Sequence, residues 1–156
     1  MSTDTGVVDP PALARSIIEA NRYLTLATAD QAGLPWASPV WFASVDLQEF
    51  FWVSSPDARH SRNLAVRPEV AVVIFDSGQP IGTGRGVYLS ARAEAVPEPD
   101  LDRGIATFSL ASQAQGGRAW GRSDIQEPAR HRLYRATAVA SYVLSDTDER
   151  IPVDLA

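Results

Sequence analysis

The 156-residue chain has no cysteine and no lysine, and these two absences remove whole classes of chemistry. Without cysteine it has no disulfide, no thiolate nucleophile and no cysteine-ligated zinc or iron–sulfur site. Without lysine it has no Schiff base and no Walker-type phosphate contact, and all 14 basic side chains are arginines. Its two histidines, His60 and His131, are far apart in sequence, so a histidine-rich metal site is not expected. A chain so poor in nucleophiles is expected to take its chemistry from a cofactor.

The net charge and the hydropathy of the chain argue against two classes of binding partner, nucleic acids and membranes. The formal net charge is −5, and an acidic chain lacks the basic field that general nucleic-acid binding requires. No apolar run approaches the roughly 20 residues that span a bilayer. Residues 1–9 are polar and lack the pattern of a signal peptide. We therefore predict a cytoplasmic protein that binds neither nucleic acid nor membrane.

The spacing of apolar residues predicts a mainly β fold in a single domain over residues 1–156, with a flexible tail at 1–8. Asp9 and the two prolines after it predict a helix, up to about Asn21, that closes one end of a barrel. Further helices are expected at about 56–66 and 101–113, and a short tail from Asp146. About six mostly antiparallel strands are expected, at 23–29, 36–44, 50–54, 69–75, 85–96 and 133–144. Short regular strands of this kind favour a small barrel.

The segment 51–62 indicates an anion site. A strand ends in two serines, and a helix is expected to begin directly after them. Backbone N–H groups at a helix start favour an anion, and serine, histidine and arginine side chains donate hydrogen bonds to one. A spacing of three places the two arginines on one helix face. The candidate side chains are Ser54, Ser55, Arg59, His60 and Arg62.

An alternative for this segment is ordinary capping by Ser55 beneath a solvated basic face. Asp57 favours the alternative, because it adds a negative charge to the first helical turn. The loop 82–86 contains three glycines and Arg85, but it precedes a strand rather than a helix, so it lacks the context of a dinucleotide fingerprint. Arg85 is retained as a candidate ligand contact from a flexible loop.

The segment 35–42 is a candidate for binding a flat ligand. Pro39 removes one ladder hydrogen bond from the expected strand, which marks an edge or a bulge and lets backbone groups face a ligand. Trp36, Trp41 and Phe42 supply aromatic walls. The alternative is that these aromatic side chains lie in the core or at a dimer interface.

Taken in order, these motifs resemble the pyridoxamine 5′-phosphate oxidase-like family of FMN-binding split β-barrels. The resemblance covers 12–144, and its most telling pieces are 23–28, 35–42 and 51–70. It implies a six-stranded antiparallel split β-barrel that forms a homodimer with FMN between the subunits. It also implies that the backbone of Ser38, Pro39, Val40 and Trp41 lies along the flavin ring, and that Ser54, Ser55, Arg59 and His60 hold the phosphate, with only Arg59 of the two arginines in direct contact.

The chain departs from the family pattern at three positions. His60 stands where lysine is frequent, which makes phosphate binding pH-sensitive. Gly86 and Ser38 stand where the oxidase has a glutamine and an arginine, and the C-terminal tryptophan and arginine signature for the pyridoxal substrate is absent. These departures argue against oxidase activity itself and leave the fold intact.

The sequence thus favours an FMN-dependent oxidoreductase that transfers hydride to or from an unknown small molecule, with no catalytic side chain assigned. The expectation of a dimer also rests on the number of aromatic side chains on short strands, because the interior of one small barrel cannot hold all of them. Two alternatives stay open. One is a deazaflavin-dependent reductase of the same fold, against which the net charge of −5 argues because that cofactor has an acidic tail. The other is a flavin- or heme-binding module without turnover.

Overall fold

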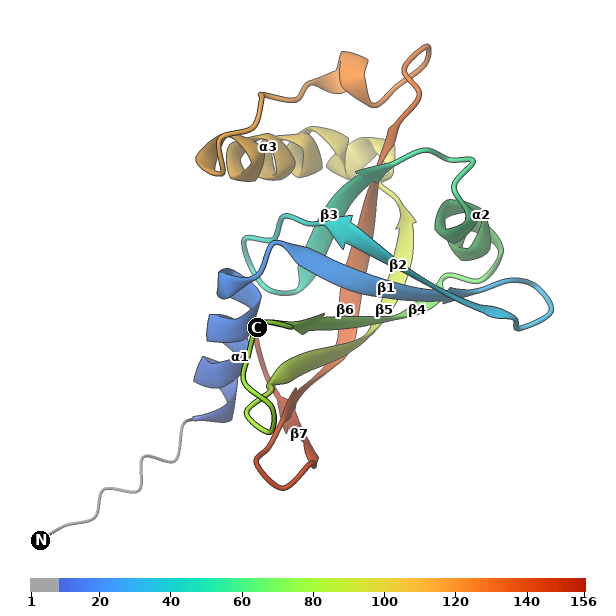
Figure 1. The fold of residues 1–156 in the computed structure, drawn as a ribbon. Helices are drawn as coiled ribbons and strands as arrows, with labels where there is room; N and C mark the ends of the chain where they lie inside the picture. The colour runs from blue at the N-terminus through green and yellow to red at the C-terminus, as the bar shows by residue number, and fades with distance from the viewer. Residues whose placement is uncertain (1–8) are drawn as a thin grey trace, which may run out of the picture.

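A computed structural model describes residues 9–156, which form three α-helices, seven strands and one 3₁₀ turn (Figure 1). The prediction of a flexible tail at residues 1–8 lies outside this described part. The elements in chain order are α1 Pro10–Ala20, β1 Tyr23–Ala29, β2 Pro35–Trp41, β3 Glu49–Ser54, α2 Arg59–Val66, β4 Glu69–Phe75, β5 Gly86–Ala95, α3 Glu98–Ala114, η1 Arg122–Asp124, β6 Arg132–Leu144 and β7 Arg150–Val153.

The strands form one antiparallel sheet that curls into a barrel, in the order β2-β1-β4-β5-β6-β3 with β7 beside β6. Strands β2 and β3 lie at the two ends of this order. Among the described residues they are joined only by an isolated bridge between Ala43 and Phe51. The barrel is therefore split between β2 and β3, and the predicted mainly β split-barrel class is confirmed.

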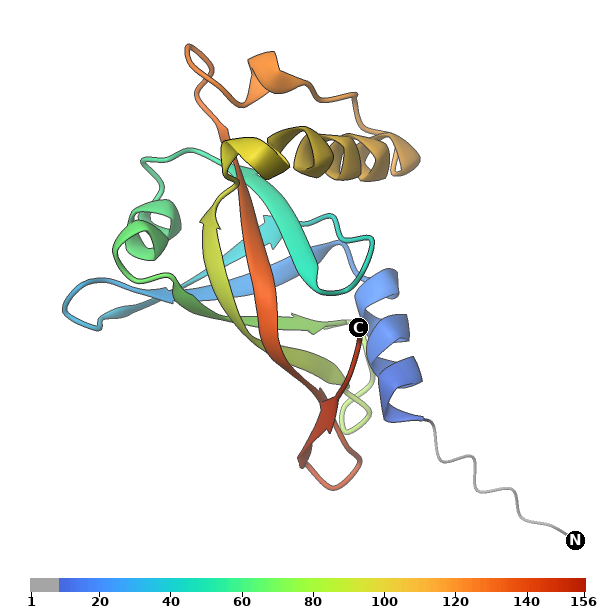
Figure 2. The same cartoon turned by 180° about the vertical axis from the view of Figure 1, so that it is seen from behind.

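All six predicted strands are present, and β1 and β4 have the predicted bounds. Strand β2 ends at Trp41 rather than Ser44, because the chain then turns toward β3 and only Ala43 keeps a bridge. The predicted tail after Asp146 is wrong. A turn in which Asp148 has a φ of 62° brings the chain back as β7 against the end of β6 (Figure 2).

Helix α1 covers one open end of the barrel, as predicted (Figure 1). Asp9 caps it, since its carboxylate accepts a hydrogen bond from the N–H of Ala12 at 3.2 Å. Ala14 and Ile18, one turn apart on the same face, are buried in the core inside the barrel. The helix therefore closes that end with apolar side chains.

Helix α2 begins later than the sequence predicts. It starts at Arg59 after Ala58, which makes no side-chain capping bond. The hydroxyl of Ser55 instead accepts from the N–H of Asp57 at 3.1 Å, which closes a local turn before the helix. Capping by Ser55 was therefore a wrong alternative. Buried Asn63 fixes the helix on the barrel, because its side-chain amide donates to the Thr28 hydroxyl of β1 at 3.0 Å.

A second core lies outside the barrel, where α3 packs across β3 and β6 (Figure 2). The helix approaches these strands closely at Gly104. A Cβ at this position would lie 3.0 Å from Leu133 and 3.1 Å from Phe51, so only glycine fits without a shift. The predicted helix at 101–113 is present and extends at both ends, to Glu98 and Ala114.

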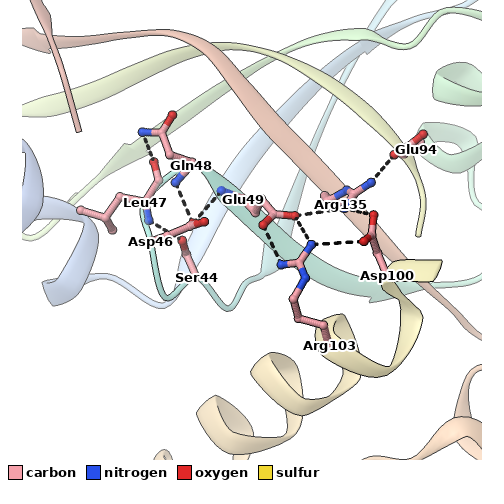
Figure 3. Close-up of polar contacts among 9 residues, drawn as sticks. All are labelled: Ser44, Asp46, Leu47, Gln48, Glu49, Glu94, Asp100, Arg103 and Arg135. Carbon is pink, nitrogen blue, oxygen red and sulfur yellow. Dashed lines mark hydrogen bonds and ion pairs between the residues drawn. The ribbon is translucent and has the colours of Figure 1, made fainter. Parts of the chain in front are cut away.

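An ion network fixes the N-terminal half of α3 to the barrel (Figure 3). Arg135 of β6, whose side chain is 10% exposed, contacts the carboxylates of Glu49 on β3 at 3.0 Å, Glu94 on β5 at 2.5 Å and Asp100 on α3 at 2.9 Å. Arg103 of α3 contacts Glu49 at 2.7 Å, and this contact lowers the pKa of the Glu49 carboxyl. One buried guanidinium therefore joins three strands and a helix.

We expect Arg135→Ala to lower the free energy of unfolding by about 3 kcal/mol, because it leaves partly buried carboxylates beside one another without their shared cation. Arg92→Ala is the matched control: it breaks an exposed pair with Glu69 and should cost less than about 1 kcal/mol. Urea denaturation of both variants measures the difference. Equal losses would mean that the network adds nothing beyond an ordinary surface ion pair.

Candidate functional site

A cleft of about 630 Å³ lies where α3 and the segment after it meet the ends of β2, β3 and α2. Figure 1 shows α3 along one side of this region and α2 on the other. The volume falls within the roughly 300–1,000 Å³ of small-molecule sites. The side chains that line the cleft include aromatic, hydroxyl, amide and imidazole groups but no carboxylate among the described residues.

One end of the cleft is polar. His60 of α2 is half-buried, and its Nε2 lies 2.9 Å from Oγ of Ser54 at the end of β3, with the tautomer deciding which group donates. Burial lowers the pKa of the His60 imidazole below its ordinary value of 6.5. The ring is therefore neutral at neutral pH, and this end of the cleft offers an imidazole and a hydroxyl to an anion or a polar group.

The opposite wall is aromatic. Buried Phe108 of α3 contacts two half-buried indoles edge-to-face, Trp41 of β2 at 5.0 Å and Trp120 at 5.3 Å between ring centroids. Nε1 of Trp41 donates to the side-chain oxygen of Gln115 at 2.9 Å, and the Arg118 guanidinium lies 3.8 Å from the centre of the Trp120 ring. Packing and hydrogen bonding thus hold these rings, and aromatic walls of this kind suit a flat conjugated ligand.

The edge of β2 also lines the cleft. Of the described strands only β1 pairs with β2, so the backbone from Pro39 to Trp41 has one side without a strand partner. Pro39, Val40 and Trp41 all line the cleft. The prediction that Pro39 marks a strand edge is confirmed, and backbone N–H and C=O groups at this edge can bond to a ligand.

The structure brings half of the predicted site residues to the cleft and leaves the other half outside it. Those that line the cleft are Pro39, Val40, Trp41, Ser54 and His60. Those outside it are Ser38, Ser55, Arg59, Arg62 and Arg85. Both the predicted ring-binding strand and the predicted phosphate segment therefore contribute to one cleft.

The three arginines of the prediction lie in different places. The guanidinium of Arg59 lies 4.3 Å from the centre of the Trp36 ring. Arg62 is exposed and lines a separate hollow with Tyr134 on the other side of α2. Arg85 pairs with Asp146 in the hairpin between β6 and β7, at the far end of the barrel (Figure 1). Ser38 is half-buried opposite Leu26 of β1, and Ser55 lines a neighbouring hollow.

Sequence reasoning missed the lining residues that come from α3 and from the irregular segment after it. These include Phe108, Gln115 and Trp120. His131, which the sequence indicated as a surface residue, is exposed and also lines the cleft. The segment 115–131 has no regular periodicity, so nothing local in the sequence indicates that it returns to β2.

Two features are absent from the described part of the chain. None of the helices between residues 9 and 156 is long and apolar enough to cross a membrane. Nor does any group of three histidine, aspartate or glutamate side chains in this range form a metal-binding cluster.

A family model described as pyridoxamine 5′-phosphate oxidase matches residues 11–144. The chain belongs to this family. A curated pyridoxine/pyridoxamine 5′-phosphate oxidase from Burkholderia thailandensis is 33% identical over 102 residues, which are 65% of this chain. The match spans 45% of the length of that oxidase, less than half. The family predicted from the sequence is thus confirmed.

Solved structures share the fold of this pyridoxamine 5′-phosphate oxidase family member. A heme-binding protein from Mycobacterium smegmatis superposes with a TM-score of 0.74 at 22% identity, covering 94% of this chain and 59% of that one. An FAD-binding protein from Mesorhizobium loti gives a TM-score of 0.64 at 21% identity, covering 84% and 91%. At such identities the similarity establishes the split-barrel fold and leaves the ligand open.

We expect the pKa of His60 to lie below 6.5 in the folded protein. The variant His131→Gln leaves His60 as the single histidine, so its ring protons can be titrated alone by NMR. Because the folded state then binds the proton more weakly than the unfolded state, the contribution of this residue to stability should fall as the pH drops from 6.5 toward the folded pKa. Unfolding the same variant in urea should return the ordinary value, and a folded pKa at or above 6.5 would contradict the burial argument.

Proposed function

We propose that the chain is an FMN-binding flavoprotein that transfers hydride to or from a small molecule. The observation that carries the proposal is the composition of the cleft that Pro39, Trp41, Ser54 and His60 line. The free edge of β2, an aromatic wall and a polar end that holds Ser54 and His60 line the same cleft. This is the set of groups that a flat ring system with a phosphate tail requires.

The residues present fit FMN in three respects. Trp41, Phe108 and Trp120 offer apolar surface to a ring system, and the β2 edge offers backbone groups to its polar rim. Ser54 and His60 offer hydrogen bonds to the phosphate. Arg59, directly before His60 on α2, would add charge to this contact by leaving its place over Trp36.

Bound flavin would supply the redox chemistry, and the side chains of the cleft would bind and orient it and the substrate. The lining side chains that can exchange a proton are Tyr23, His60 and His131. Since no carboxylate lines the cleft among the described residues, an exposed imidazole such as His131 is the better placed group for proton exchange with a substrate. The cytoplasmic location stays a prediction from the sequence.

A heme-binding function without turnover is the second candidate. Two histidines line one cleft that also has aromatic walls, and imidazole is a frequent axial ligand of heme iron. The absorbance spectrum of the purified protein separates the two candidates. The visible absorbance band of a bound flavin supports the proposal, whereas an intense Soret band after addition of heme supports the second candidate.

We expect FMN to bind much more tightly than riboflavin. Removing the phosphate leaves the Ser54 and His60 donors without a partner, at about 1.5–3 kcal/mol for each hydrogen bond to a charged group, which is about tenfold or more in affinity. Ser54→Ala should weaken FMN and leave riboflavin unchanged. Titration followed by flavin fluorescence measures all four affinities. Equal affinities of the native protein for FMN and riboflavin would exclude a phosphate site at this end.

We also propose that the protein is a homodimer. Tyr23 at the rim of the cleft is 60% exposed, and Trp36 and Leu34 at the other end of the same strand pair are 42% and 57% exposed. Large exposed apolar groups on the β1–β2 hairpin favour burial by another subunit. Light scattering at micromolar concentration should give about twice the chain mass of 16.9 kDa. A species of 16.9 kDa alone would refute the dimer.

A further inference from the structure

A separate hollow lies on the other side of α2 from the cleft, between this helix and the end of β5 (Figure 1). Its volume is about 390 Å³, within the range of small-molecule sites. Among the described residues it shares no lining side chain with the cleft. Helix α2 separates the two spaces, because His60 lines the cleft and Ser61, the next residue, lines the hollow. The proposed function makes no use of this hollow.

The sequence explains why α2 leaves space on this side. The helix is fixed toward β1, where the side-chain amide of Asn63 donates to the Thr28 hydroxyl at 3.0 Å. Toward β5 the hollow is lined by Ala93 and Ala95, whose side chains are single methyl groups. Just after the helix the chain is tied to β5, because the N–H of Ala93 donates to the carbonyl of Pro68 at 2.8 Å. Two hydrogen bonds thus hold α2 in place while short side chains leave space between it and the strand.

The lining of the hollow combines apolar surface with one buried hydroxyl. Leu64, Ala65 and Pro68 contribute apolar groups. Ser61 is only 2% exposed, and its Oγ has no hydrogen-bond partner among residues 9–156. A serine within a helix commonly bonds to a carbonyl of the preceding turn, and a buried polar group without a partner costs about 1–3 kcal/mol. A bound molecule with one hydrogen-bonding group would remove this cost.

The other side chains of the hollow favour a neutral aromatic ligand. Tyr134 of β6 is 5% exposed and stacks on buried Trp52, with the ring centroids 6.0 Å apart, so the wall contains a fixed aromatic ring. Neither charged side chain of the lining is placed to hold an ion. Glu94 is paired with Arg135 at 2.5 Å, and Arg62 is exposed, so that water screens its charge.

We propose that this hollow binds a neutral molecule with a single aromatic ring and one hydroxyl group, of which phenol is the simplest example. The ring packs against the apolar lining, and the hydroxyl bonds to Oγ of Ser61. The volume of the hollow leaves room for substituents on the ring. This site does not depend on the FMN proposed for the cleft, so either proposal can fail without the other.

The test titrates phenol and toluene, which differ by a hydroxyl and a methyl group, and follows the backbone amide signals of α2 and β5 by NMR. Ser61→Ala should weaken the binding of phenol about fivefold, the loss of one hydrogen bond, and leave that of toluene unchanged. This variant should fold normally, because alanine favours a helix and the hydroxyl that it removes has no partner in the described chain. Ala95→Leu fills the hollow from an exposed position on β5 and should abolish the binding of both molecules.

Ser16→Ala is the matched control, since Ser16 is an exposed helical serine on α1, away from α2 (Figure 1). It should leave the affinities for phenol and toluene unchanged. A native protein that binds neither molecule at millimolar concentration would overturn the proposal, as would an unchanged affinity of Ser61→Ala for phenol. Phenol that is displaced by FMN, or that still binds to Ala95→Leu, would lie elsewhere and would also overturn it. Tighter binding of benzoate than of phenol would overturn the assignment to a neutral ligand.

Discussion

The incomplete closure of the barrel is the constraint on which the rest of the structure depends. The strand order leaves β2 and β3 at opposite ends of one sheet, and only the bridge between Ala43 and Phe51 joins them in the described chain. A closed barrel would satisfy every backbone group of β2 and leave no edge. Because closure stops at one bridge, Pro39 to Trp41 keep one side free beside a cleft. The site is therefore a direct result of the topology.

An open edge alone would not make a cleft, since a cleft also requires walls that stay in place. Helix α3 supplies one wall, and two kinds of contact fix its position. Apolar side chains pack it against β3 and β6, and the ion pairs of Arg135 with Glu49 and Asp100 fix its N-terminal half. Helix α2 supplies the polar end, held by the buried bond from Asn63 to Thr28. Each wall thus depends on a polar contact between residues that do not line the cleft.

Most of the fold could be predicted from the sequence, because strand alternation and helix capping are local properties. Tyr23–Ala29 alternates, Glu69–Phe75 is a short apolar run typical of a buried strand, and Asp9 caps the first helix as its position indicates. The wrong predictions fall where the same residues can form either of two local structures. Ser55 bonds to Asp57 in a turn instead of capping a helix, and a left-handed residue in a turn produces β7 where a tail was expected.

The candidate site was predictable only in part, for a related reason. Ser54 and His60 are six residues apart in one segment, so their contact follows from a strand that ends beside a helix. The contact between Trp41 and Gln115 spans 74 residues and depends on how α3 packs on the barrel. The family resemblance pointed to the strand that lines the cleft with Pro39, Val40 and Trp41, but no local pattern pointed to the aromatic residues of α3 and the loop after it. The wall that is built from distant segments had to come from the structure.

Gly104 has a consequence for how this scaffold can change. It lies one turn before Phe108 on the same face of α3, and a methyl group there would be closer to Phe51 and Leu133 than ordinary van der Waals contact. A Cβ there would lie 3.0 Å from Leu133 and 3.1 Å from Phe51, so these side chains or the helix would have to shift by a few tenths of an ångström. A position outside the cleft thus governs how closely the helix that carries Phe108 approaches the barrel. A substitution at Gly104 would therefore change the packing of α3 without replacing any side chain that lines the cleft.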